Sequence, residues 1–388
     1  MSFQLAERFA SLPPYPFAEL DRLKSEARAK GADLIDVGIG DPDQPTPEHI
    51  IKTLCNAAND SSNHHYPSYW GMQSFKDAVG RYYERKFSVS LDSKNEIIAL
   101  IGSKEGIAHA PLAFVNPGEN VLVPNPGYPV YQVSAIMAGG IPYDVPLKKE
   151  NNFLPDLGSI PSDVAKKSRL IFLNYPNNPT SAVATEEFFK EVIEFAKNYD
   201  ILVCHDAAYL DVSYEGYVPL SFLQIPGAKE VGIEFHSLSK TYNMTGWRIG
   251  FAAGNSDLIS GLGKVKTNVD SGIFQAIQIA GIEALDGDQT SVEEMRHLYT
   301  ERRDVLVSGL RKLGLDVETP KATFYVWMQI PKNFKTSAEC SAFLLTKAGI
   351  VATPGTAFGS VGEGFIRFAL TVNKERLGEL VKRLEEIL

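Results

Sequence analysis

The sequence predicts an α/β protein with a mostly parallel sheet, followed by a smaller α+β domain. Short apolar runs alternate with helical stretches between about residues 70 and 285. Apolar runs without polar alternation suit strands buried on both faces, and regular alternation of strand and helix is typical of a parallel sheet. The last hundred residues change pattern, with two amphipathic helical segments and two short strands.

Taken in order, the first expected elements are a helix and a short strand. Residues 17–31 contain helix formers and end at Gly31, a suitable helix C-cap. Residues 33–40 form an apolar run that ends in glycines, which we interpret as a strand. Five further apolar runs are expected to be the strands of the main sheet: 96–102, 120–124, 169–176, 201–206 and 231–239.

The C-terminal part is expected to be a separate, smaller unit. Its first helix, 291–314, opens with the capping-box spacing of Ser291 and Glu294 and carries an apolar stripe. For the closing helix, 374–388, a coiled coil is the alternative, but two heptads are too few to form one. The remaining expected elements are strands 324–330 and 365–371 and the closing amphipathic helix 374–388. We therefore divide the chain into an N-terminal arm with part of the small domain (1–45), a large domain (46–285) and a small domain (286–388).

Composition excludes several classes of function. The 388 residues are 44% hydrophobic and 22% charged, and the net charge is −9, from 38 basic and 47 acidic residues. A negative balance repels phosphate backbones, so we expect no nucleic-acid partner. No apolar run approaches the ~18 residues of a membrane span, and the N-terminus lacks a signal core. We expect a soluble, cytoplasmic protein of two domains.

The cysteines also suit a protein of the reducing cytoplasm. Cys55, Cys204 and Cys340 are odd in number and far apart, and no CxxC pair occurs. A disulfide framework or a zinc site is therefore not expected. His64, His65 and His205 are interpreted as structural or peripheral, because two adjacent histidines do not easily place both rings on one ion. No metal is expected.

Polar residues follow the expected strands at the edge where open α/β sheets bind ligands. They comprise one carboxylate, one amide, two phenols, two cations and a hydroxyl. These residues are Ser103, Lys104, Tyr128, Asn178, Asp206, Tyr209 and Lys240.

Part of this edge suits a phosphate dianion. The stretch GSKEG (102–106) places free N–H groups at a helix N-terminus, although an ordinary strand-to-helix turn is the alternative. Ser237, Ser239 and Arg248 add two hydroxyls and a fork-shaped cation. Neither a Walker spacing nor GxGxxG occurs, which disfavours a nucleotide.

Lys240 is the candidate nucleophile. An ordinary lysine amine is protonated at neutral pH, but burial and a nearby cation such as Arg248 favour the neutral form. A neutral lysine beside a phosphate site is what a Schiff base with pyridoxal phosphate requires. A solvated surface lysine is the alternative interpretation, which the surrounding sequence disfavours.

Other side chains suit the same cofactor. Asp206 ends a very apolar strand, where it would keep a pyridine nitrogen protonated; a helix cap is the alternative. Asn178 and Tyr209 are candidates to hydrogen-bond the phenolic oxygen, and Tyr128 to stack on the ring. Arg367 is the candidate for a substrate α-carboxylate, with an internal salt bridge as the alternative.

These motifs resemble a known family. YPNNPT (175–180), HDAAY (205–209) and SLSKTYNMTGWRIG (237–250), followed by the arginine strand, are similar to class I/II aminotransferases of fold type I. The resemblance covers essentially the whole chain and is greatest to the LL-diaminopimelate aminotransferase subfamily. It implies pyridoxal 5'-phosphate and a large domain with a mostly parallel seven-stranded sheet flanked by helices.

The resemblance also implies roles for individual residues. Lys240 would form the Schiff base and move the substrate proton, assisted by Asp206 and Tyr209. The substrate would meet Arg367 and the backbone of Gly40, and Tyr15 would cover it. Substrate contacts are also implied for Lys104, Tyr128 and Asn178. The implied phosphate contacts are Ser103, Lys104, Ser237, Ser239 and Arg248.

A homodimer is implied as well. Tyr66 or Tyr69, in HHYPSYWG (64–71), would contact the phosphate in the neighbouring subunit. Two departures from the family pattern concern other parts of the site. Ser181 replaces a glycine in the turn after Asn178, and 265–272 lacks an obvious match for an asparagine that some diaminopimelate enzymes place there.

The implied function is a ping-pong transamination in lysine biosynthesis. It would join LL-2,6-diaminopimelate and tetrahydrodipicolinate to 2-oxoglutarate and glutamate. An aminotransferase for aspartate, alanine or aromatic amino acids, or a β-lyase on the same fold, remains an alternative. A DNA-binding regulator would need ~60 more, basic residues. A purely structural dimer would not need Lys240, Asp206 and Arg367 together.

Overall fold

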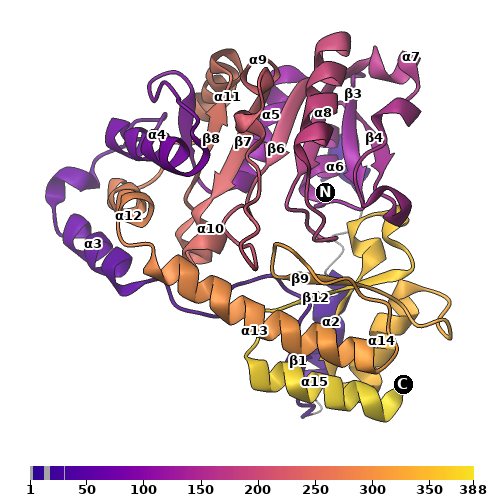
Figure 1. The fold of residues 1–388 in the computed structure, drawn as a ribbon. Helices are drawn as coiled ribbons and strands as arrows, with labels where there is room; N and C mark the ends of the chain where they lie inside the picture. Colours follow the sequence, from indigo (N-terminus) through magenta and orange to yellow (C-terminus); the bar gives the residue numbers. More distant parts are fainter. Residues whose placement is uncertain (1–2, 13–17, 30) are drawn as a thin grey trace.

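The larger sheet of the protein has seven strands and lies in the upper part of the view in Figure 1. The computed structural model describes residues 3–12, 18–29 and 31–388. The strand order is β2-β8-β7-β6-β5-β3-β4. The strands are β2 (Ile97–Leu100), β3 (Asn120–Asn125), β4 (Ile141–Pro146), β5 (Ser168–Asn174), β6 (Leu202–Asp206), β7 (Gly232–Ser237) and β8 (Gly250–Gly254).

The sheet is mostly parallel, as the sequence predicts. Strands β4, β3, β5, β6 and β7 run parallel to one another, whereas β8 is antiparallel to both β2 and β7. The sequence analysis missed β4 and β8. Strand β4 lies at the edge and is partly exposed, and β8 reads GFAAG, so neither presents a long apolar run.

Helices cover both faces of this sheet, which explains why its central strands lack polar alternation. On β6, Val203 packs into the core with α4, α8 and α12, while Cys204 packs into the core with α5, α6 and α11. The helices are α3 (Glu48–Ala58), α4 (Gln73–Phe87), α5 (Ser103–Phe114), α6 (Val130–Met137), α7 (Ser162–Ala165), α8 (Glu186–Tyr199), α9 (Ala228–Val231), α10 (Leu238–Thr241), α11 (Ser256–Val269) and α12 (Gln275–Asp286).

A smaller α+β unit lies below the large sheet in Figure 1. Its antiparallel sheet has the order β11-β12-β9, and β1 pairs with β10 in parallel. The strands are β1 (Ile35–Asp36), β9 (Tyr325–Gln329), β10 (Ile350–Val351), β11 (Thr353–Pro354) and β12 (Phe365–Ala369). Its helices are α2 (Ala18–Ala29), α13 (Thr290–Lys312), α14 (Ser337–Ala348) and α15 (Lys374–Ile387). The short helix α1 (Glu7–Ala10) instead contacts α6 of the large unit.

The N-terminal segment joins the smaller unit through the pairing of β1 with β10. The strand expected at 33–40 is only two residues long, because the chain then turns toward other partners. The Gly38 carbonyl accepts hydrogen bonds from the side chains of Thr353 and Arg367. Gly31 has a φ of +78°, as expected of a residue that ends a helix. The domain boundary expected at 285/286 falls at the end of α12.

The expected capping box of the long helix is wrong. Helix α13 begins at Thr290, so Ser291 already lies inside its first turn. The Asp288 carboxylate accepts from the Thr290 backbone N–H at 3.0 Å, and the Ser291 hydroxyl is buried without a hydrogen-bond partner among the described residues. None of the helices in the described part of the chain has the length and apolar character that a membrane span needs.

Candidate active site

A cavity of about 320 Å³ lies between the strand ends of the large sheet and the smaller unit. Most of the residues singled out in the sequence line it. They are Gly40, Ser103, Lys104, Tyr128, Asn178, Asp206, Tyr209, Ser237, Ser239, Lys240, Arg248 and Arg367. The cavity therefore brings together residues that are far apart along the chain.

Parallel pairing sets the positions of three of these side chains. Asn174 ends β5 and lies beside Asp206 at the end of β6, and Ser237 ends the next strand, β7. The Asn174 side chain donates to the Asp206 carbonyl at 2.8 Å and accepts from the Asn178 N–H at 2.7 Å. The strand ends and the following loop are thus joined directly at the cavity.

Lys240 enters the cavity from α10, directly after β7. Its Nζ donates to the Gly40 carbonyl at 2.8 Å. Burial lowers the pKa of Lys240 to about 8; Asp41 opposes this shift, while Arg367 and Arg248 add to it. This agrees with the prediction that burial and a neighbouring cation favour the neutral amine.

Asp206 is a buried residue of the cavity wall. Its Oδ2 accepts a hydrogen bond from the Tyr131 hydroxyl at 2.8 Å, and its Oδ1 has no hydrogen-bond partner in the described part of the chain. Burial raises the pKa of Asp206, and the Tyr131 hydrogen bond acts against this shift. A buried carboxylate oxygen without a partner is costly unless a ligand supplies a donor, preferably a charged one. Asp206 does not cap a helix.

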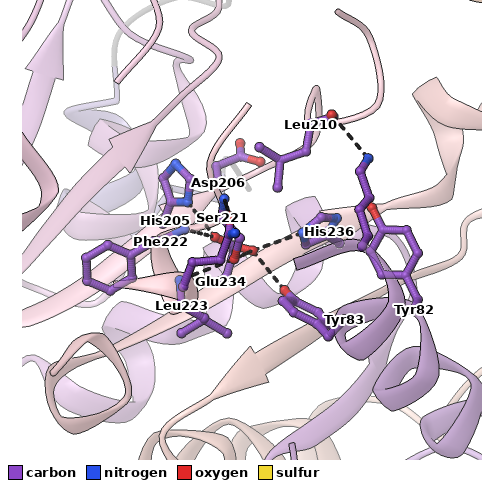
Figure 2. A network of polar contacts seen from close by, with 12 residues as sticks. Tyr82, Tyr83, His205, Asp206, Leu210, Ser221, Phe222, Leu223, Glu234 and His236 are labelled. Atoms are coloured by element: carbon purple, nitrogen blue, oxygen red, sulfur yellow. Dashed lines mark hydrogen bonds and ion pairs between the residues drawn. The ribbon is translucent and has the colours of Figure 1, made fainter. Parts of the chain in front are cut away.

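A buried carboxylate, Glu234, ties two strands together behind the cavity (Figure 2). Glu234 accepts from His205 Nδ1 at 2.9 Å and contacts His236 Nε2 at 3.1 Å. These histidines directly precede Asp206 on β6 and Ser237 on β7. The carboxylate thus fixes the ends of the strands that carry both cavity residues.

The surrounding contacts define the role of His205. Its Nε2 accepts from the Tyr175 N–H at 3.2 Å, so the proton is on Nδ1 and points to Glu234. Tyr83 and Ser221 also donate to Glu234, each at 2.9 Å. Burial raises the pKa of Glu234, but hydrogen bonds from the two histidines outweigh burial and lower it. His205 therefore has a structural role here, as the sequence analysis predicted.

The start of α5 forms a cationic corner of the cavity. Gly102, with a φ of +75°, is the N-cap residue of α5. A Cβ at Gly102 would lie 2.5 Å from Arg248 Nη2, so glycine permits the guanidinium to reach the helix N-terminus. Arg248 Nη1 donates to the Thr245 carbonyl at 2.8 Å. Free N–H groups, a guanidinium and the hydroxyls of Ser237 and Ser239 make a site suited to a phosphate.

Arg367 is buried between two aromatic rings on the opposite wall. Its guanidinium carbon is 4.2 Å from the Tyr325 ring centroid and 4.6 Å from that of Phe358. Nη1 donates to Asn178 Oδ1 at 2.8 Å and Nη2 to the Gly38 carbonyl at 2.6 Å. Burial lowers the pKa of Arg367. Nε has no partner among the described residues, and no ion pair of Arg367 occurs among them, so the internal salt bridge considered above is not formed.

The structure adds lining residues that the sequence analysis missed. Tyr325 contacts the Tyr209 hydroxyl at 3.0 Å and packs so closely on Gly40 that a Cβ there would clash. Tyr131, on α6, was also missed; it donates to Asp206 without lining the cavity itself. Tyr325 and Phe358 carried no local signal, because they reach the site from the smaller unit. The other missed lining residues are Asp21, Ile39, Asn174, Ala208 and Thr245.

Some expected site residues do not line this cavity. Tyr66 and Tyr69 are 88% and 45% exposed and lie outside it. Tyr15 lies outside the described residues. His64 and His65 are exposed.

The two departures noted in the sequence have simple local structures. Ser181 takes the glycine position with a φ of +62°, and its hydroxyl donates to the Tyr325 carbonyl at 2.7 Å. The turn therefore keeps a residue in the left-handed region of φ and gains a hydrogen bond to β9. In 265–272, Asn268 is exposed on α11 and donates to the Lys264 carbonyl at 2.7 Å.

The chain is similar to known aminotransferases over its full length. Residues 32–384 match the family model "Aminotransferase class I and II". A protein of Syntrophobacter fumaroxidans named LL-diaminopimelate aminotransferase is 58% identical over 387 residues, which cover 100% of both chains. A protein of that name from Moorella thermoacetica is 54% identical, over 99% of this chain and 98% of its own.

Solved structures are also similar to this chain over its full length. Substrate-bound BacF of Bacillus subtilis superposes with a TM-score of 0.95 at 38% identity, covering 100% of this chain and 98% of that one. A mutant of Thermus thermophilus aspartate aminotransferase gives a TM-score of 0.93 at 27% identity, with both chains fully covered. With the matched family model, the seven-stranded sheet and the cavity at its strand ends, the chain belongs to the class I and II aminotransferases.

Proposed function

We propose that this protein is a pyridoxal-phosphate-dependent LL-diaminopimelate aminotransferase of lysine biosynthesis. It transfers an amino group between LL-2,6-diaminopimelate or tetrahydrodipicolinate and 2-oxoglutarate or glutamate. The observation that carries the reaction type is one cavity holding Lys240, with a lowered pKa, and Asp206, with an unpartnered oxygen. The substrate assignment is supported by the full-length relatives of that name.

The residues present fit pyridoxal 5'-phosphate. The unpartnered Asp206 Oδ1 suits a protonated pyridine nitrogen, which supplies the missing charged donor. Asn178 and Tyr209 would hold the phenolic oxygen, and Tyr128 would lie against the ring. The phosphate would be held by Ser103, Lys104, Ser237, Ser239 and Arg248. When bound, the cofactor supplies an electron sink for the charge that develops at the substrate Cα.

Lys240 serves as the covalent anchor of the cofactor and as the proton carrier. With a pKa of about 8, a substantial fraction of the amine is neutral near physiological pH. A neutral amine at this position would condense with the cofactor aldehyde with loss of water and, when free, would accept the proton from the substrate Cα. The Gly40 carbonyl, 2.8 Å from Nζ, orients the amine while it is free.

Arg367 orients the substrate. Nη1 and Nη2 are anchored to Asn178 and Gly38, and each keeps a second N–H for a carboxylate. Holding the α-carboxylate fixes the direction of the Cα–H bond relative to Lys240. The first half-reaction releases a 2-oxo acid, which cyclises to tetrahydrodipicolinate when diaminopimelate is the donor. The second half-reaction runs the same proton transfer in reverse on another 2-oxo acid.

The proposal includes a cytoplasmic homodimer. Tyr66, 88% exposed, and Tyr69 would complete the phosphate site of the neighbouring subunit. The exposed ring of Phe274 lies 6.3 Å from the ring of His64, two residues before Tyr66. Exposed apolar side chains near one another are typical of an interface. Tyr15 is proposed to cover the substrate. The three cysteines are free, which supports a reducing compartment.

An absorbance titration tests the proposal. The purified, cofactor-loaded protein is mixed separately with LL-diaminopimelate, glutamate, aspartate and alanine, and conversion of the yellow cofactor to its aminated form is followed. We expect conversion by diaminopimelate and glutamate only, and none in Lys240→Ala. Conversion by aspartate or alanine but not diaminopimelate would keep the mechanism and refute the substrate. Release of pyruvate and ammonia from β-substituted alanines would indicate a β-lyase.

A further inference from the structure

The charged side chains that line the cavity are unevenly distributed. Four are cations and two are carboxylates: Lys104, Lys240, Arg248, Arg367, Asp21 and Asp206. Asp206 is buried and is hydrogen-bonded to Tyr131. Among the described lining residues, Asp21 is therefore the carboxylate left to meet the part of a substrate that points away from the cofactor.

Asp21 reaches the cavity from α2, which lies beside β1, since Lys24 of α2 pairs with Asp36 of β1. Its side chain is 56% exposed, so it faces both the cavity and solvent. The neighbouring Lys24 Nζ lies 3.5 Å from Asp21 Oδ1 but only 2.6 Å from Asp36 Oδ2. Lys24 is thus engaged mainly by Asp36, and the Asp21 carboxylate retains acceptor capacity for a further cation.

The two amino donors of the proposed reaction differ at their far ends. Both carry an α-ammonium and α-carboxylate, and both carry a distal carboxylate. Only diaminopimelate has a second ammonium group on its distal carbon. The cations that line the cavity are assigned to the phosphate, the α-carboxylate and the cofactor, and none of them can bind this ammonium. Its binding therefore needs a carboxylate.

We infer that Asp21 is a specificity-determining residue that binds the distal ammonium of LL-diaminopimelate. The inference rests on the proposed function. Asp21 would distinguish the two donors by the one charge in which they differ, because glutamate has no distal ammonium. Because α2 lies in the N-terminal segment, the residue that selects the long substrate belongs to a different segment from those that perform proton transfer.

The test is a thermodynamic cycle on single half-reactions. Wild type and Asp21→Asn are titrated with LL-diaminopimelate, with L-2-aminopimelate, which lacks only the distal amine, and with glutamate. We expect Asp21→Asn to raise the half-saturating diaminopimelate concentration about 5- to 30-fold, a range between that of an exposed ion pair and a charged hydrogen bond. The values for L-2-aminopimelate and glutamate should stay within about 2-fold, since exposed charges without a partner contribute little.

Matched variants complete the design. Glu26→Gln removes a carboxylate from the same helix; Glu26 pairs with Arg22 and does not line the cavity, so all three values should be unchanged. Asp21→Glu should restore part of the preference for diaminopimelate.

Equal changes for all three donors, or no change for diaminopimelate, would overturn the role of Asp21. Wild-type protein that converts glutamate but not diaminopimelate would instead refute the proposed substrate, and this inference with it. Conversion by glutamate also shows in each variant that the fold and the cofactor site are intact.

Discussion

Arg367 and Asn178 are hydrogen-bonded to each other, with Nη1 of the arginine 2.8 Å from Oδ1 of the asparagine. The two residues are 189 positions apart, one on β12 of the smaller sheet and the other in the loop after β5 of the larger sheet. The hydrogen bond links the proposed α-carboxylate site to the proposed cofactor site. This hydrogen bond thus couples the position of Arg367, which would bind the substrate, to the position of Asn178, which would orient the cofactor.

Replacing Arg367 with lysine should impair substrate binding more than cofactor binding. A lysine cannot keep the hydrogen bonds to Asn178 and Gly38 and also receive a carboxylate. We expect the catalytic efficiency for amino acids to fall about 100-fold or more, as for loss of a buried charged hydrogen-bond partner. Single-turnover rates measured against substrate concentration check this, with cofactor affinity as the control. An unchanged efficiency would contradict the carboxylate role.

Replacing Asp206 with alanine should leave a site that still holds the cofactor phosphate but transfers protons poorly. The buried partner of the pyridine nitrogen is then missing, so charge at the substrate Cα is no longer stabilised. We expect a fall in the single-turnover rate of at least about 100-fold. Rapid-mixing absorbance measures it, and wild-type turnover in this variant would refute the proposed role of Asp206.

Tyr131→Phe tests a smaller effect on the same carboxylate. The Tyr131 hydroxyl donates to Asp206 Oδ2, and that bond acts to lower the pKa of Asp206. Its loss should raise this pKa further and weaken the hold on a protonated pyridine nitrogen. We expect about a 3- to 20-fold fall in rate, since only part of the energy of one hydrogen bond to a charged group, about 1.5–3 kcal/mol, acts on the rate. Ring packing should persist, because the Tyr131 and Phe172 rings stack at 5.0 Å without the hydroxyl. An unchanged rate would show that Tyr131 does not act on Asp206.

The reactivity of Lys240 in cofactor-free protein should change near pH 8. Its pKa of about 8 lies below that of an ordinary lysine, so the neutral, nucleophilic amine accumulates at lower pH than on exposed lysines. Competitive acetylation with acetic anhydride, read by peptide mass spectrometry, should show a midpoint near pH 8 for the Lys240 peptide. Exposed-lysine peptides in the same sample are the internal reference. A midpoint near ~10.4 would contradict the effect of burial.

Asp211 should make stability depend on pH in acid. Burial raises its pKa, but the ion pair with Lys86 and the hydrogen bonds from Lys86 and Thr241 outweigh burial and lower the pKa from 3.8 to about 2. The folded-state pKa is the lower one, so this stabilisation is present above pH 3.8 and is lost as the pH falls toward 2. Its size is about 2 kcal/mol.

Asp211→Asn isolates this contribution. We expect a loss of about 3 kcal/mol at pH 7, because Lys86 keeps its charge without its partner. The free energy of unfolding, measured by urea denaturation between pH 5 and 3, should fall less steeply in the variant than in wild type. Parallel curves for the two proteins would contradict the assignment.

The sequence predicted most of the sheet and much of the cavity because their signals are local. Buried strands read as apolar runs, and the side chains after them, such as Asp206 and Lys240, stand at one sheet edge by the geometry of parallel strands. The edge strand β4 and the small-residue strand β8 escaped detection, because burial on one side or by small side chains leaves no apolar run. The capping box failed because α13 begins at Thr290, whose N–H is bound by Asp288, three positions before Ser291.

The sequence by itself determined the family resemblance, the α/β class and the chemical set of lysine, aspartate and arginine. Only the tertiary structure decided which further groups face that set: Tyr131 on Asp206, Tyr325 and Phe358 around Arg367, and Asp21 at the cavity. The lowered pKa of Lys240 was likewise settled by packing, since desolvation depends on what surrounds the amine. Local residue types specify strands and turns, whereas burial and contacts between segments hundreds of residues apart exist only once the chain has folded.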